Sequence, residues 1–149
     1  MEIRKIETDK KEYLSLLLLA DEQEDMIDRY LERGDMYVLD DGGVRAECVV
    51  TDEGNGILEL KNLAVRPDSQ GKGYGRKMIR FVADTYRNRF CILHVGTGDS
   101  PATLPFYEKC GFRRSHVVRN FFTEHYDHPI YECGKQLVDM VYLKMELDR

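Results

Sequence analysis

The six residues from Gln70 to Gly75 are the part of this sequence that most constrains how the chain can fold. They read Gln-Gly-Lys-Gly-Tyr-Gly and follow an apolar segment that ends at Val65. Beyond them, apolar residues recur at the spacing of one helix face: Met78, Ile79, Val82, Ala83 and Tyr86. Glycines allow a tight turn with an accessible backbone, and a helix start carries unpaired N–H groups with about half a positive charge. The pattern therefore predicts a strand, a turn and a helix that together can bind an anion such as a phosphate.

Two common phosphate-binding motifs do not fit this turn. A Walker A loop requires G-x-x-x-x-G-K-[ST], and that spacing is absent. A Rossmann fingerprint requires G-x-G-x-x-G, whereas the sequence from Gly71 reads G-x-G-x-G and places Arg76 where the last glycine should stand. Taken alone, the turn is as consistent with a purely structural role as with ligand binding.

The rest of the sequence predicts alternating strands and helices in one domain over residues 1–149. The expected strands are residues 2–7, 36–39, 44–51, 57–65, 90–95, 112–119 and 137–147. The expected helices are residues 9–19 with Asp9 as N-cap, residues 21–32, the helix after the glycine-rich turn, and residues 101–110. Residues 121–135 are expected as a long loop whose aromatic and acidic side chains either contact a cationic amine or only cover the core. This order indicates an α/β fold with a mixed sheet and helices on its faces.

Composition and charge limit the classes of protein to which this chain can belong and the partners it can have. A hydrophobic fraction of 42% and a charged fraction of 33% suit a globular domain. The longest apolar run, residues 16–20, is too short for a membrane span, and the N-terminus carries no signal-type segment, so we expect a cytoplasmic protein without a membrane partner. The formal net charge of −5 argues against nucleic acid as a partner. We expect no metal site, because His125, His128 and Cys133 match no zinc-binding spacing.

Three motifs in a fixed order carry a family resemblance. Gln70-x-x-Gly73-x-Gly75 matches the [RQ]-x-x-G-x-[GA] signature of the GNAT superfamily of N-acetyltransferases. Residues 63–68 before it resemble that family's strand and loop, and residues 104–112 resemble its later A-x-x-x-Y-x-x-x-G-F helix. The chain resembles small bacterial members from about Val44 onward. The resemblance implies a mostly antiparallel central sheet of about seven strands flanked by about four helices.

The resemblance also implies a donor and the residues that bind it. The donor is acetyl-CoA, used as a co-substrate with an amine acceptor and without a metal. The implied contacts to its pantetheine and pyrophosphate are Leu63, Ala64, Val65, Gln70, Gly71, Lys72, Gly73, Tyr74, Gly75 and Arg76. The sequence departs from the family at Asp99, where an asparagine often binds the pantetheine. An ionised aspartate accepts but does not donate hydrogen bonds, so this contact is either lost or taken over by Ser100.

Glu59 is the candidate general base. Strand alternation places Glu59, Lys61, Leu63 and Val65 on one face if no bulge intervenes. The spacing E-x-x-x-L-A-V is similar to that of the catalytic glutamate in histone-acetylating members of the family. The alternative is a half-exposed strand glutamate paired with Lys61 or with a base on a neighbouring strand.

Tyr107 is the candidate general acid. An ordinary tyrosine pKa near 10 keeps the hydroxyl protonated at neutral pH, so it can donate to a departing thiolate. A tyrosine at this motif position commonly has that role in the family. The alternative is an aromatic residue that only packs beside Phe106 and Phe112.

The expected function is acetyl transfer to an amine by direct attack within a ternary complex. The alternative is an inactive acyl-CoA-binding sensor or interaction module. The acceptor stays open among aminoglycosides, polyamines, amino acids and protein amines, and the oligomeric state stays open between a monomer and a homodimer.

Overall fold

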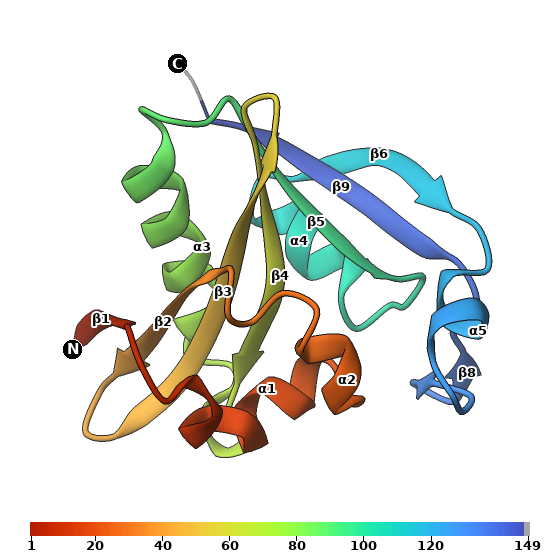
Figure 1. Cartoon of the computed structure of the whole chain (residues 1–149), viewed down its shortest axis with the longest axis horizontal. Coiled ribbons are helices and arrows are strands. Elements are labelled where there is room, and N and C mark those ends of the chain that lie inside the picture. Colours follow the sequence, from red (N-terminus) through yellow and green to blue (C-terminus); the bar gives the residue numbers. More distant parts are fainter. Residues whose placement is uncertain (148–149) are drawn as a thin grey trace.

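A computed structural model describes residues 1–147 and forms one central sheet covered by helices on both faces (Figure 1). The strands are β1 Glu2–Ile6, β2 Asp35–Asp40, β3 Val44–Gly54, β4 Ile57–Val65, β5 Ile92–Gly98, β6 Arg113–Val118, β7 Tyr131–Glu132, β8 Lys135–Gln136 and β9 Met140–Glu146. The α-helices are α1 Leu14–Ala20, α2 Glu24–Ile27, α3 Tyr74–Tyr86, α4 Leu104–Lys109 and α5 Phe121–His125. Two 3₁₀ turns, Lys10–Tyr13 and Pro67–Ser69, precede α1 and α3.

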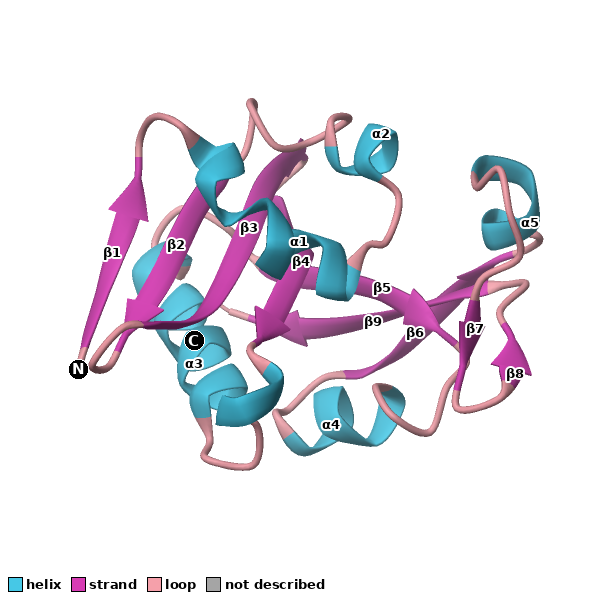
Figure 2. Ribbon diagram, turned by 90° about the horizontal axis from the view of Figure 1, so that it is seen from below, coloured by secondary structure: helices cyan, strands magenta, loops and turns pink. Residues whose placement is uncertain are grey.

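The sheet order is β1-β2-β3-β4-β5-β9-β6. Every neighbouring pair in it is antiparallel except β4 and β5, which run parallel. Figure 2 shows α1 and α2 on one face of this sheet and α3 and α4 on the other. The expectation of a mixed, mostly antiparallel sheet of seven strands is confirmed. Within residues 1–147 five α-helices flank it, one more than the four expected, because α5 forms in the segment expected as a loop.

Two apolar clusters fill the space between the sheet and its helices. The cluster beneath α3 and α4 contains Leu58, Leu60, Met78, Ile79, Val82, Leu93, Leu104 and Phe112. The cluster beneath α1 and α2 contains Leu17, Ile27, Leu31, Met36, Val38 and Val49. Consecutive β3 residues supply opposite clusters, as strand alternation requires. The helix face predicted after the glycine-rich turn is buried as expected.

The N-terminal helices differ from the sequence expectation. Asp9 is not a side-chain N-cap: its φ of 55° is left-handed, and a 3₁₀ turn follows it before α1 begins. The helix expected over residues 21–32 is α-helical only in α2 and continues as irregular turns to Gly34. The buried ammonium of Lys10 donates to the carbonyl oxygens of Leu31 at 2.9 Å and Gly34 at 2.7 Å. Lys10 thus supplies hydrogen bonds to backbone carbonyl groups at the end of the turn region, so these groups do not need the partners that a regular helix would provide.

The segment over residues 121–135, expected as a loop, is partly ordered into α5 and the short β7–β8 hairpin. Cys133 and Gly134 form the hairpin turn with φ values of 53° and 75°. Phe122, Ile130 and Leu137 make a separate small apolar cluster beneath it. The segment therefore closes one end of the sheet, beside the ends of β5 and β9 (Figure 2).

Candidate active site

The sheet opens between β4 and β5. These strands pair only from Ile57–Leu60 to Ile92–Val95, although β4 continues to Val65 and β5 to Gly98. The strands therefore diverge beyond Leu60, which Figure 2 shows as β4 and β5 running apart. The exposed backbone of this opening is the first element of the candidate site.

A bulge in β4 coincides with the point where the strands part. Val49 pairs with Asn62 and Val50 pairs with Leu60, so Lys61 has no partner on β3. A one-residue bulge shifts the side-chain alternation of the strand. Leu63 thus joins Leu58 and Leu60 on the face covered by α3.

This bulge corrects the expected position of Glu59. Leu63 and Val65 pack against the cluster beneath α3, whereas Glu59 lies on the opposite face with its cross-strand partner Thr51. Glu59 therefore does not share a face of the sheet with Leu63 and Val65. The sequence contains the signal: apolar residues at 58 and 60 are followed by apolar residues at 63 and 65, a spacing of three where a regular strand has two.

The glycine-rich turn has the backbone that an anion site requires. Gly71 and Gly73 have φ values of 78° and 86°, in the left-handed region that glycine adopts most readily. A Cβ atom at either position would meet no protein atom within 4 Å, so the space beyond both residues is open. Gly73 is the N-cap of the 13-residue helix α3 and offers no side-chain cap. The first-turn N–H groups of α3 are therefore free to bind an anion.

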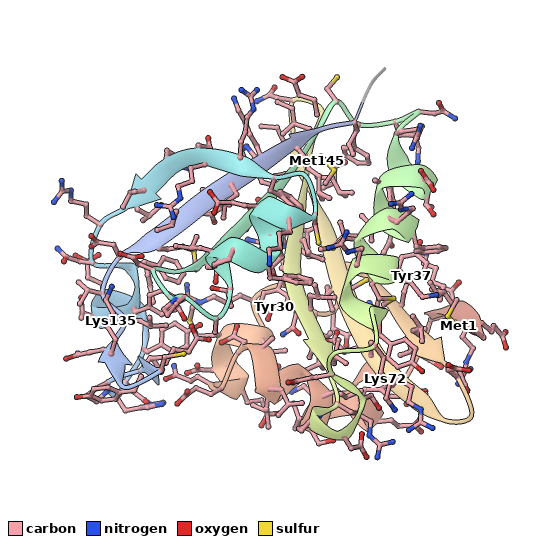
Figure 3. The ribbon with its side chains drawn as sticks, turned by 180° about the vertical axis from the view of Figure 1, so that it is seen from behind. Met1, Tyr30, Tyr37, Lys72, Lys135 and Met145 are labelled. Carbon is pink, nitrogen blue, oxygen red and sulfur yellow. The ribbon has the colours of Figure 1, made fainter. Side chains whose placement is uncertain are left out.

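The side chains of the turn fix its position. The Tyr74 hydroxyl donates to Asp41 Oδ2 at 2.6 Å, and Gln70 Nε2 donates to the Val65 carbonyl at 3.3 Å. A Cβ atom on Gly75 would lie 3.0 Å from Phe106 Cζ, so this glycine lets α3 approach α4. Lys72 and Arg76 are exposed at the same end of the helix. Figure 3 shows Lys72 on this turn, far from Lys135 at the other end of the molecule.

A cavity of about 290 Å³, which we call the Tyr107 cavity, lies at the opening of the sheet. Lys61, Leu63, Gly96 and Tyr107 line it, together with the α1–α2 connection and the segment from α5 to β7. The Tyr107 ring packs edge-on against Phe106 and Phe112, with centroid distances of 5.1 and 5.6 Å. Burial, followed by the nearby Cys110 and Glu132 groups, raises the pKa of Tyr107 above its usual range. The hydroxyl thus stays protonated throughout the neutral range.

Glu59 faces a second cavity of about 150 Å³, which we call the Glu59 cavity. Its Oε2 atom accepts a hydrogen bond from the Tyr142 hydroxyl at 3.1 Å and lies 3.2 Å from Lys61 Nζ. The residue is only 8% exposed. Asp21 and Tyr126 line both cavities, so the two spaces adjoin. Glu59 is therefore paired with Lys61, as the alternative expected, but it is buried instead of half-exposed and faces a cavity.

Asp99 and Ser100 follow β5 and are held by other parts of the protein. Asp99 lies on the surface, and its Oδ2 atom is 3.3 Å from Lys135 Nζ. Ser100 is 1% exposed, and its Oγ accepts from the Ala102 N–H at 3.1 Å at the approach to α4. Ala64 points to the face opposite Leu63 and Val65, so only its backbone borders the α3 side.

Sequence reasoning missed Tyr142 and Tyr30, and it included Tyr126 only as one aromatic residue of the segment 121–135, without its contact to Asp21. Tyr142 contacts Glu59 from β9, and the hydroxyls of Tyr30 and Tyr126 both donate to Asp21, at 3.0 and 2.6 Å. Asp21 and Tyr126 are 105 positions apart in the chain, and no local pattern signals their contact. Only the fold brings them together.

The sequence profile described as Acetyltransferase (GNAT) domain matches residues 32–114, more than half of the chain. The chain therefore belongs to the GNAT family of acetyltransferases, which confirms the family resemblance of the motifs.

Individual relatives agree with this assignment. An uncharacterized N-acetyltransferase of Bacillus subtilis, YvbK, is 37% identical, with 91% of this chain and 90% of that protein covered. A GNAT family acetyltransferase from Elizabethkingia anophelis, solved with acetyl-CoA bound, has a TM-score of 0.93 at 33% identity, covering 98% of this chain and 97% of that chain. An IAA acetyltransferase from Bacillus cereus has a TM-score of 0.90 at 39% identity, covering 98% of this chain and 99% of that chain. Within residues 1–147, no helix is both long and apolar enough to cross a membrane.

Proposed function

We propose that this protein transfers an acetyl group from acetyl-CoA to a primary amine of a small molecule or peptide, by direct attack within a ternary complex. The observation that carries the proposal is the opening between β4 and β5. One side of the opening meets the glycine-rich turn, and the other meets the Tyr107 and Glu59 cavities. A donor bound on the first side and an amine bound on the second would meet within the opening.

The donor side fits a pyrophosphate and a pantetheine. The uncapped first turn of α3 and the open space beyond Gly71 and Gly73 suit phosphate oxygens, with Lys72 and Arg76 nearby. Leu63 and Val65 supply an apolar edge for the pantetheine arm, and β4 beyond Leu60 has no strand paired with it on the β5 side.

The acceptor amine must lose a proton before it attacks. A lysine-type amine with a pKa near 10.4 is about 4.6 kcal/mol from its neutral form at pH 7, whereas an α-amine is only about 1 kcal/mol away. Glu59 is the proposed base, because it is a buried carboxylate that faces the Glu59 cavity. Tyr142 and Lys61 orient its Oε2 atom and leave Oε1 for the amine or for a relaying water.

The remaining steps use the backbone and Tyr107. A backbone N–H of Val65 or a neighbour stabilises the tetrahedral oxyanion, since β4 has no sheet partner on the β5 side there. Collapse of the intermediate breaks the carbon–sulfur bond while Tyr107 donates its proton to the departing thiolate. The proton that the nitrogen then releases restores the Tyr107 hydroxyl through solvent. The products are the N-acetyl amine and CoA.

Thiol release from acetyl-CoA across a panel of primary amines tests this proposal. We expect release to depend on both an amine and the protein, with a matching N-acetyl product by mass spectrometry. If acetyl-CoA raises the melting temperature but no amine gives turnover, the protein is instead an acyl-CoA sensor. If no acyl-CoA stabilises the chain, both functions are excluded.

Substitution Glu59→Gln tests the base. We expect turnover at pH 7 to fall by about 100-fold with a lysine-type amine, within the usual range for general base catalysis. The loss should shrink as the pH approaches the pKa of the amine, because the free amine then needs no base. An equal loss at every pH would assign Glu59 a positioning role instead.

A further inference from the structure

The Tyr107 cavity has more carboxylate groups than cationic groups in its lining. Asp21, Glu22, Asn62 and Glu132 line it, whereas Lys61 is its one lining ammonium or guanidinium group among residues 1–147. The hydroxyls of Thr97 and Thr103 bond to each other at 2.8 Å. This imbalance is a property of the cavity into which the acceptor would enter.

Asp21 is a carboxylate without a cationic partner within the described residues. Its two oxygens accept one tyrosine hydroxyl each, from Tyr30 and Tyr126, and the carboxylate also has a backbone hydrogen bond from Gln23. Burial raises the pKa of Asp21 despite these hydrogen bonds. A cation placed beside Asp21 would relieve this destabilisation of the charged form.

Glu132 and Asn62 carry buried oxygens that lack a donor. Glu132 makes no side-chain hydrogen bond or ion pair with any residue from 1 to 147, and its Oε1 atom is fully buried. Asn62 is 3% exposed and donates through Nδ2 to the Leu17 carbonyl and the Tyr30 hydroxyl. Its Oδ1 atom is likewise buried with no donor in the described part of the chain. Buried polar atoms are normally paired, so these oxygens point to a ligand rich in N–H groups.

Three other charges near the cavity are paired, whereas Arg29, which lines the adjoining Glu59 cavity with Asp21, forms no ion pair among residues 1–147. Lys61 Nζ lies 3.2 Å from Glu59 Oε2, and Glu22 Oε2 lies 2.9 Å from His128 Nε2. Lys135 Nζ lies 3.3 Å from Asp99 Oδ2. Asp21 and Glu132 therefore have no ion-pair partner at the cavity wall among residues 1–147, and Arg29 is the cation of the adjoining space with which a bound ammonium group would compete.

We propose that the acceptor is a diamine or polyamine, whose second, non-reacting ammonium group is bound by Asp21 and Glu132. The inference rests on the proposed acetyl transfer. The amine that attacks must be neutral, so it cannot compensate these carboxylates during the reaction. A second protonated nitrogen on the same acceptor compensates them in both the ground state and the transition state.

A set of three amines of equal chain length tests the proposal: 1,4-diaminobutane, n-butylamine and 4-aminobutyrate. We expect kcat/KM for the diamine to exceed that for butylamine by about tenfold or more, the usual effect of a hydrogen bond to a charged group. The amino acid should be the poorest acceptor because its carboxylate meets like charge. Equal use of the diamine and butylamine, or a preference for the amino acid, would overturn the proposal.

Two near-isosteric variants, Asp21→Asn and Glu132→Gln, localise the effect. Each should lower the ratio of diamine to butylamine kcat/KM by about tenfold. Asp25→Asn is the matched control, since it removes one negative charge from the neighbouring α2 and lines neither cavity. Retention of the ratio in both cavity variants would contradict the assignment, provided that acetyl-CoA still raises their melting temperatures.

Calorimetry with 1,4-diaminobutane in the presence of CoA separates this inference from the proposed function. If the diamine binds more tightly to the wild-type protein than to Glu132→Gln but no amine is acetylated, the binding site stands and the transfer proposal fails. If butylamine is acetylated and the diamine binds no more tightly than butylamine, transfer stands and this inference fails.

Discussion

At the scale of single residues, Tyr107 is the side chain whose chemistry is most open to a direct test. Tyr107→Phe keeps the edge-on packing with Phe106 and Phe112 and removes only the hydroxyl. We expect turnover to fall by about 100-fold, a typical contribution of general acid catalysis, while the Kd for acetyl-CoA stays within about twofold. Steady-state kinetics and calorimetry measure the two quantities. Unchanged turnover would leave Tyr107 as a packing residue.

Glu47 provides a residue-scale prediction about stability. It lies on β3, is 0% exposed, and neither carboxylate oxygen has a hydrogen-bond partner within residues 1–147. Burial raises the pKa of Glu47 well above its usual value. A raised folded-state pKa contributes stability that is fully present below the unfolded pKa, near 4.3, and is lost as the pH rises through the folded pKa.

Glu47→Gln removes this titration. Relative to the wild-type protein, the free energy of unfolding of the variant should rise with pH by about 1.4 kcal/mol per unit between pH 4.3 and the folded pKa. Urea unfolding at pH 5, 6, 7 and 8 measures the difference. Parallel stability curves for the two proteins would show that Glu47 titrates normally in the fold.

At the scale of elements, the glycine-rich turn is where conformation and charge can be separated. Gly73→Asp places a carboxylate at the start of α3, where like charge repels a phosphate. Gly73→Asn has similar size and tolerates the left-handed backbone, so it is the matched control for strain. We expect the Asp variant to bind acetyl-CoA at least tenfold more weakly than the Asn variant, measured by calorimetry. Equal affinities of the two variants for acetyl-CoA would show that its phosphates do not bind at this turn.

Most of the strands, the glycine-rich turn and α3 could be predicted from the sequence, because their signals are local. The β4 bounds agree with residues 57–65 as expected, and the helix face of α3 follows from its apolar spacing. The GNAT motifs gave the order of these elements and the donor side of the candidate site.

The elements that the sequence did not reveal depend on contacts between distant residues. The turns after α2 are held by Lys10, which is more than 20 positions away from the carbonyls it binds. The β7–β8 turn uses Cys133 with a positive φ, a conformation that cysteine rarely adopts. The bulge at Lys61 shifts the apolar pattern of β4 by one residue, and the expectation that Glu59 shares a face with Leu63 and Val65 applied only to a strand without a bulge.

At the scale of the whole molecule, donor binding should stabilise the fold as a unit. Acetyl-CoA at 100 times its Kd adds about 2.7 kcal/mol to the free energy of unfolding, which corresponds to a rise in Tm of roughly 5–10 °C for a domain of this size. An acetyl-pantetheine thioester at the same concentration should give a much smaller rise, because it lacks the phosphates that the start of α3 binds. Equal rises would place the binding energy in the pantetheine arm alone.

The short pairing between β4 and β5 also affects the dynamics of the sheet. Only four residues on each strand join the part of the sheet containing β1 to β4 to the part containing β5, β9 and β6. Backbone amides on β4 beyond Leu60 that face the opening lack a sheet partner, so they should exchange their hydrogens with solvent faster than those of β3. A donor bound in the opening would pair with this free edge of β4 as an additional strand does. Donor binding alone, without an acceptor amine, should therefore slow amide hydrogen exchange along β4.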